Sequence, residues 1–225
     1  MTFNPYYYVK EKLEDGLGHS KIELSEVLLK EKYSQEAVDN IFKAFSVDWN
    51  DQLQKRTKEL IDYERCHGLE DLSNELLKQG FAVDEIKKVL SDSDVQKQMC
   101  YKELMSYIEC STRFWTFDHL SSQIQYEGFT EELYNDAVKM MTTEDFELLY
   151  KNNLQHVMAW YCTQGKCTKD DLVGYLAEKD ADSEMCSYIF EHGNFDFAEH
   201  EQTKAENSEP DDEFDFPSDI DYSSM

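Results

Sequence analysis

The chain has 225 residues, 40% of them hydrophobic, and a formal net charge of −26. That charge argues against direct binding to nucleic-acid phosphates or to an anionic membrane surface, because both require lysine and arginine. A field of this sign attracts basic proteins instead. The start of the chain lacks the basic and apolar segments of a leader, and no apolar run approaches the ~20 residues that a bilayer span needs. We therefore expect a cytoplasmic protein with no membrane span.

A two-helix pattern of apolar residues appears four times along the chain, and the fourth copy is the weakest. Its leading leucines are spaced by 48, 48 and 52 residues, and they are Leu24, Leu72, Leu120 and Leu172. A near-constant period of this kind is the signature of a repeat architecture. With only 3 Pro and 8 Gly in the chain, helices are favoured over many-turned β structure.

A further helix precedes each copy, so the predicted unit has three helices. The fold class that we predict is all-α, a tandem array of about four three-helix, helix-turn-helix-like repeats. The predicted boundaries are 5–45, 46–91, 92–141 and a degenerate 142–193. The predicted helices are 5–17, 20–30, one from Ser34 to about 45, 49–64, 69–79, 82–91, 93–110, 117–126, 130–141, 144–161, 168–178 and 182–192.

The last two helices of each unit are separated by a recurring corner. Gly80 and Gly128 suit the left-handed conformation that ends a helix, while the outer copies have Lys32 and Asp180 at this place. The residue that should cap the following helix is Ser34, Ala82, Thr130 or Asp182, and three of these four side chains can cap. An acid stands two positions later in every copy, and we interpret these four acids as helix-start devices: Glu36, Asp84, Glu132 and Glu184.

The segment 194–225 differs in composition from the rest of the chain. It holds eleven acidic residues against one base, Lys204, and we predict that it is a disordered tail when alone. Acidic stretches with interleaved apolar residues can bind basic, partly apolar grooves. We therefore predict that the tail contributes to partner binding through Glu209, Asp211, Asp212, Glu213, Phe214, Asp215, Phe216, Asp219, Asp221 and Tyr222.

The repeats resemble those of the host-cell-surface-exposed lipoprotein family, called Ltp, of phages and Gram-positive bacteria. The likeness covers roughly 8–141 and fades over 144–192. It is carried by Ala37-Val38-Asp39-Asn40, Val47-Asp48-Trp49-Asn50, Gly68-Leu69, Glu75-Leu76, Gly80-Phe81, the stretch QYEGFT at 125–130, and Ala137-Val138.

What the resemblance implies is a compact three-helix module used for protein contact. In the family, such modules can act in superinfection exclusion, in which a resident phage blocks the entry of another phage's DNA. The chain departs from the family pattern in lacking a leader with a lipid-carrying cysteine and in ending with an acidic tail. A weaker likeness is to the recombination regulator RecX, also built from three-helix repeats.

Residue patterns for other kinds of site are poor. The predicted third helices of the units carry only one basic pair, Lys87-Lys88, so we expect no direct nucleic-acid binding. Cys66-His67 and the pair Cys162 and Cys167 lack the partner pair of a zinc site. No glycine-rich phosphate loop is present, and nothing selects a nucleophile or an acid–base pair. We expect no catalytic residue, no metal and no cofactor.

The sequence leads to one main functional hypothesis and two alternatives. The main one is a non-enzymatic phage or mobile-element protein, in a bacterial cytoplasm, that binds and inhibits a basic protein, such as one that handles nucleic acid, by DNA mimicry. One alternative is an envelope-acting exclusion protein of the Ltp type. The other is a RecX-like recombination regulator. The partner's identity and the oligomeric state are left open by the sequence.

Overall fold

The computed structural model describes residues 3–63, 67–110 and 113–198, and all of their regular secondary structure is helical. The all-α class predicted from the sequence is confirmed for this part of the chain. The helices are α1 Pro5–Glu14, α2 Lys21–Lys30, α3 Gln35–Phe45, α4 Trp49–Tyr63, α5 Gly68–Lys78, α6 Val83–Leu90, α7 Ser93–Glu109, α8 Phe117–Tyr126, α9 Glu131–Met140, α10 Thr143–Thr163, α11 Lys169–Glu178 and α12 Ser183–His192.

Each of the four predicted ranges contains three of these helices, with ends within a few residues of the predicted ones. Capping by side chains explains where the third helices begin. Ser34, Thr130 and Asp182 each accept a hydrogen bond from a main-chain amide three residues later, whereas Ala82 makes no side-chain cap. These contacts satisfy amides that have no partner inside the helix.

The four corners between the second and third helices share one main-chain geometry. Lys32, Gly80, Gly128 and Asp180 all have positive φ, between 54° and 92°. In every corner, the next residue donates its amide to the carbonyl five residues earlier, as Phe81 does to Leu76 at 3.2 Å. This is the Schellman closure of a helix. The first and fourth corners keep it without glycine, against a steric cost of roughly 1–2 kcal/mol for a side chain in this conformation. That the four groups are repeats of one unit stays a prediction.

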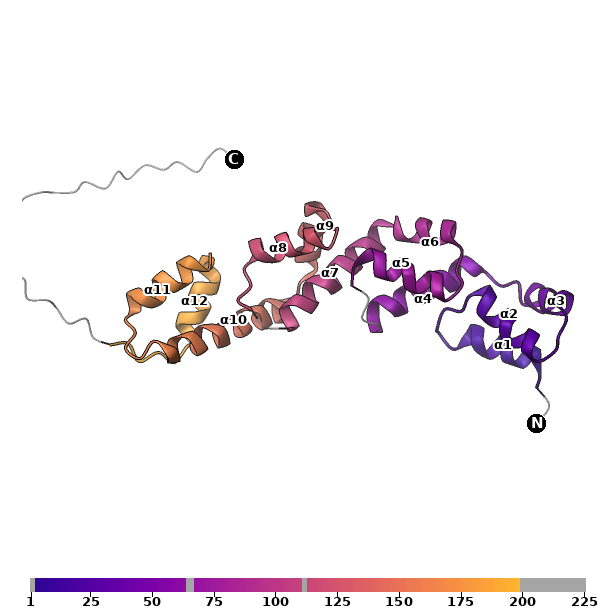
Figure 1. Ribbon diagram of the computed structural model, residues 1–225, viewed down its shortest axis with the longest axis horizontal. Coiled ribbons are helices and arrows are strands. Elements are labelled where there is room, and N and C mark those ends of the chain that lie inside the picture. Colours follow the sequence, from indigo (N-terminus) through magenta and orange to yellow (C-terminus); the bar gives the residue numbers. More distant parts are fainter. Residues whose placement is uncertain (1–2, 64–66, 111–112, 199–225) are drawn as a thin grey trace, which may run out of the picture.

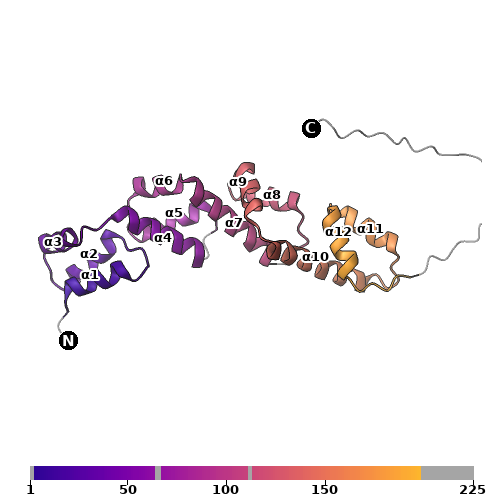
Figure 2. The same ribbon diagram turned by 180° about the vertical axis from the view of Figure 1, so that it is seen from behind.

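The helices form an elongated array, with α1–α3 at one end and α10–α12 at the other (Figure 1). The view from behind shows the same order (Figure 2). The long helix α7 contacts both α4 and α10. Helices α5 and α6 pack against α4 and α7, α8 and α9 pack against α7, and α12 packs against α10.

The buried apolar residues fall into two clusters. One is confined to α1–α3 and their neighbours, and the other is continuous from α4 to α12. The junction between α1–α3 and the rest of the array therefore depends on other contacts.

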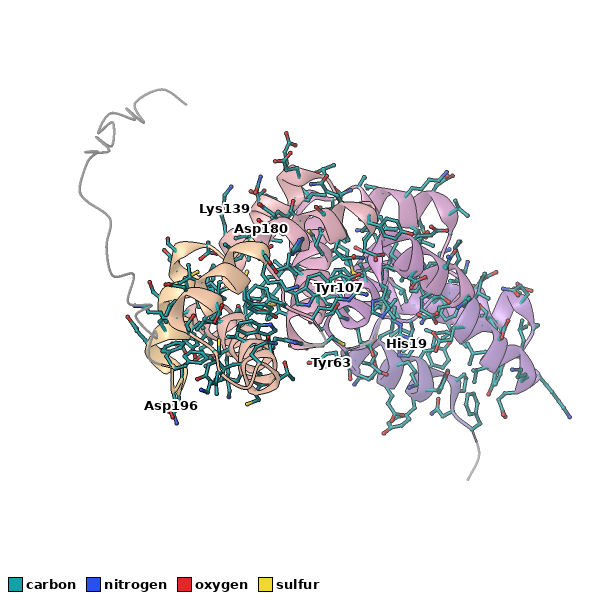
Figure 3. All side chains as sticks on the ribbon, turned by 60° about the vertical axis from the view of Figure 1, so that its left-hand side comes forward. His19, Tyr63, Tyr107, Lys139, Asp180 and Asp196 are labelled. Atoms are coloured by element: carbon teal, nitrogen blue, oxygen red, sulfur yellow. The ribbon has the colours of Figure 1, made fainter. Side chains whose placement is uncertain are left out.

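The first residues of the predicted disordered tail, 194–198, lie within the described residues and pack against α10 and the segment that follows it. The Phe195 ring meets Tyr161 with centroids 5.1 Å apart, and the Tyr161 hydroxyl donates to the Asp196 carbonyl. The Ala198 amide donates to the Cys167 carbonyl at 3.0 Å. The two phenylalanines of this segment, Phe195 and Phe197, explain the packing. Asp196, which lies between them in the sequence, is labelled in Figure 3. The rest of the predicted tail, 199–225, lies outside the described residues.

Candidate functional site

The predicted partner-binding residues, all within 209–222, lie outside the described residues, and their role stays a prediction. The folded array itself offers exposed acids. Glu36, Asp84, Glu132 and Glu184, at the starts of α3, α6, α9 and α12, are all exposed to solvent. An acid at this place is also favoured by the helix dipole, so its exposure is compatible with a structural role and leaves its carboxylate accessible.

Many of the chain's own bases are paired with its own acids. Some pairs lie within one helix, and others join two, as Lys97 of α7 and Asp136 of α9 do at 3.2 Å. The described pairs include Lys10–Glu14, Lys12–Asp15, Lys21–Asp39, Lys55–Asp51, Arg56–Glu59, Lys78–Glu75 and Lys139–Asp136. With 48 acids against 22 lysines and arginines, at least 26 carboxylates have no lysine or arginine in the chain to balance them.

A groove with a volume of about 1030 Å³ lies along α7. Residues of α7 between Gln98 and Glu109 supply much of its lining. Ile61 and Asp62 from the end of α4 lie on its lining, as does Asp145 from the start of α10. We call this cavity the α7 groove. Tyr107, one of its lining residues, is labelled in Figure 3.

A buried carboxylate lies in the lining of the α7 groove. The Glu103 side chain is only 2% exposed, and its Oε1 lies 3.3 Å from Nδ1 of His67, which is 59% exposed. Burial raises the pKa of Glu103, while the hydrogen bonds from His67 and from the Gly68 amide lower it, and the net shift is upward. The carboxylate also caps α5, whose N-cap residue His67 makes no side-chain cap of its own.

Aromatic side chains form part of the same lining. The ring of Tyr107 meets Trp115 edge-on with centroids 5.5 Å apart. The Tyr107 hydroxyl donates to Glu127 at 2.7 Å and accepts from the Gln123 amide at 3.2 Å. Burial, and then the hydrogen bond to Glu127, raise the pKa of Tyr107 to about 12. The hydroxyl therefore stays protonated and keeps donating across the physiological range.

The main chain of Trp115 is held by hydrogen bonds, whereas its indole N–H makes none in the described structure. Its amide donates to Oδ1 of the fully buried Asn153 at 3.0 Å, and its carbonyl accepts from Nδ2 of the same residue at 2.7 Å. The indole Nε1, by contrast, is buried without a hydrogen-bond partner in the described structure. An unsatisfied buried donor is costly and calls for an explanation.

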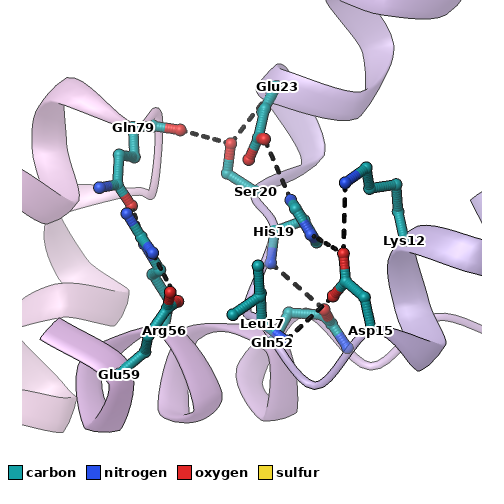
Figure 4. A network of polar contacts seen from close by, with 10 residues as sticks. All are labelled: Lys12, Asp15, Leu17, His19, Ser20, Glu23, Gln52, Arg56, Glu59 and Gln79. Carbon is teal, nitrogen blue, oxygen red and sulfur yellow. Dashed lines mark hydrogen bonds and ion pairs between the residues drawn. The ribbon is translucent and has the colours of Figure 1, made fainter. Parts of the chain in front are cut away.

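A second polar cluster joins α1–α3 to α4–α6 (Figure 4). The ring of His19, 6% exposed, lies between Glu23, at 3.0 Å from Nδ1, and Asp15, at 2.9 Å from Nε2. The His19 amide donates to Gln52 of α4 at 3.3 Å, and the Ser20 hydroxyl donates to the carbonyl of Gln79, at the end of α5. The two apolar clusters do not merge at this junction, and hydrogen bonds join α1–α3 to α4–α6 there.

The junction predicts a pH-dependent stability. The hydrogen bond to Glu23 raises the pKa of His19; burial opposes this, and Asp15 adds to it. Because the folded pKa lies above the unfolded value of 6.5, the stabilisation is fully present below pH 6.5 and is lost as pH rises through the folded pKa.

We expect the variant His19→Gln to lose on the order of 1 kcal/mol below pH 6.5 and less at alkaline pH. The measurement is the urea-unfolding free energy of both proteins across that range. As a control, His192→Gln changes a histidine of α12 that stacks on Tyr188, remote from the junction. An equal loss for His19→Gln at every pH would contradict a titrating junction.

Three other features bear on what the described part of the chain can do, namely metal sites, disulfides and membrane-spanning helices. There, no group of three or more His, Cys, Asp or Glu side chains is placed to hold a metal ion, and the five cysteines are free thiols. No described helix is both long and apolar enough to cross a membrane. Lys87 and Lys88 lie in the last turn of α6, where cations suit the helix dipole.

The sequence did not reveal Glu103 or Trp115 as site residues. One signal for Glu103 was available, because it occupies a core position of α7, among the buried Met99, Cys100 and Leu104. An acid at an apolar position of a helix is rarely buried without a partner. No sequence signal indicated that the indole of Trp115 would lack an acceptor.

A scan against protein-family models, a search of curated proteins and a search of solved structures each found no match for this chain. The class that the structure defines is an all-α protein with an elongated array of helices. The likeness to the Ltp repeats, and the weaker one to RecX, stay predictions from the sequence.

Proposed function

We propose that this chain is a non-enzymatic phage or mobile-element protein that binds and inhibits a basic protein partner. The observation that carries the proposal is the excess of 48 acidic residues over 22 lysines and arginines. Several of these lysines are already paired with an acidic residue of the chain. A partner rich in lysine and arginine would supply the missing counter-charges, and the complementary fields would speed its association.

The shape of the molecule supports a finer form of this proposal, nucleic-acid mimicry. The array is elongated (Figure 1), and exposed acidic residues occur along it. Such an array could occupy a basic groove that otherwise holds a nucleic-acid backbone, with carboxylates in place of phosphates. Inhibition would follow because nucleic acid and the array would compete for the same groove.

Co-purification from host cells tests the proposal. The tagged full chain is expected to retain a basic protein at low salt and to release it as salt is raised, because salt screens contacts between exposed charges. The retained protein is identified by mass spectrometry. Retention of no basic protein, or retention indifferent to salt, would overturn the proposal. A salt-indifferent partner from the cell envelope would favour the exclusion function that the Ltp resemblance implies.

A second bait separates the tail from the array. In it, the acids of 209–221 are replaced by their amides, which keeps their size and removes their charge. We expect weaker retention of the same partner, because the tail is predicted to take part in binding. Unchanged retention would show that the prediction for the tail is wrong and would place the binding on the array.

A further inference from the structure

The lining of the α7 groove includes a buried carboxylate and a buried donor that has no acceptor in the described structure. Glu103 is the carboxylate, which accepts from the Gly68 amide and lies 3.3 Å from Nδ1 of His67. Trp115 has an indole N–H with no acceptor in the described structure. One is an anion that burial disfavours, and the other is a donor that burial leaves unsatisfied.

Acidic residues outnumber lysine and arginine in the lining of the groove. Asp62 and Glu109 are exposed residues of its lining, and the half-buried Asp145, which accepts from the Tyr101 hydroxyl at 2.9 Å, is a third acid of the lining. Lys102 also lines the groove, but its ammonium donates to the Leu60 carbonyl at 3.2 Å, and Arg113 is the other full cation of the lining. The aromatic faces of Tyr101 and Tyr107 add surfaces of the kind that attract cations.

We propose that the α7 groove binds an arginine- or lysine-bearing segment of a basic protein partner. The cation of the segment lies between Glu103 and the exposed carboxylates of the lining, and a main-chain carbonyl beside it accepts from the Trp115 indole. Glu103 and Nε1 of Trp115 are both buried in the free protein, so both contacts require the groove walls to move apart on binding. The inference rests on the proposed function and names the place where such a partner inserts.

The test uses two double variants with the same change in net charge. The groove variant is Asp62→Lys with Glu109→Lys, and the control is Glu31→Lys with Glu178→Lys. All four acids are exposed and lie at the C-terminal ends of helices, where a cation suits the dipole, so all four changes are compatible with folding. Equal thermal unfolding temperatures check this.

The probe is a short amphipathic peptide of leucine and arginine, compared with the same peptide carrying neutral citrulline in place of arginine. We expect the groove variant to bind the arginine peptide about tenfold more weakly than the unchanged chain, and the control only about twofold more weakly, because close charges count for more than screened distant ones. The citrulline peptide should bind poorly to all three proteins.

A site-specific signal completes the test. The indole ¹H–¹⁵N resonance of Trp115, assigned by its loss in Trp115→Phe, should shift when the arginine peptide binds, whereas those of Trp49 and Trp160 should not. Equal weakening in both double variants with no shift at Trp115 would overturn the groove while leaving the proposed function intact. Binding of arginine and citrulline peptides with equal affinity would overturn the groove as a cation site and count against the electrostatic basis of the function.

Discussion

Leu72→Ala is expected to destabilise the folded array by about 2–5 kcal/mol, the range found when a fully buried leucine is truncated. Leu72 lies in α5 with no exposed surface and belongs to the core that runs from α4 to α12. Truncation removes buried apolar contacts and leaves a cavity, since neighbouring helices can collapse into it only in part. The measurement is the free energy of urea unfolding at neutral pH.

The same helix supplies the control. Leu77 is 40% exposed, and Leu77→Ala should change the unfolding free energy by at most about 1 kcal/mol, because much of its side chain stays in water in the folded state. Both substitutions create the same residue in the same helix, so helix propensity cancels in the comparison. Equal losses in the two variants would show that Leu72 is not a core residue.

The second large effect is expected at Gly18, where the chain passes from α1 to α2 against α4. A Cβ built at this position would overlap the Gln52 carbonyl oxygen and the Arg56 amide nitrogen. Both are main-chain atoms of a helix and cannot rotate away. Gly18→Ala should therefore push α1–α3 from α4, with a loss of about 1–3 kcal/mol or more, as overpacking costs. Amide hydrogen exchange should show the loss of protection in residues of α1–α3.

Gly174→Ala is the matched control for this change. Gly174 lies inside α11, and a Cβ there would meet nothing within 4 Å. Because alanine is the better helix former, this variant should gain up to about 1 kcal/mol. If Gly18→Ala were as well tolerated as Gly174→Ala, the close approach of the α1–α2 segment to α4 would be contradicted.

The helices could be predicted from the sequence because their signals are local. Ser34, Thr130 and Asp182 cap within three residues of themselves, and the corner at Gly80 is closed by atoms five residues apart. Spacing of apolar residues and capping chemistry determine such features without knowledge of the tertiary fold. The helix ends were accordingly predicted to within a few residues.

The α7 groove could not be predicted in the same way, because its lining combines residues from α4, α7 and α10, and Asp62 and Asp145 are more than 80 positions apart in the sequence. Only the packing of the long helices brings Asp62 and Asp145 to one cavity. The packing of 194–198 was not predicted for a related reason. The composition of 194–225 is acidic as a whole, but Phe195 and Phe197 at its start find an aromatic partner, Tyr161, on α10.

The most direct test of the central claim is the dissociation constant of the purified complex with the captured basic partner, measured by calorimetry as salt is raised. If exposed carboxylates carry the binding, the constant should increase about tenfold or more between low and high salt, since screening shortens the reach of surface charges to about 3 Å at 1 M. A constant that does not change with salt would contradict the account.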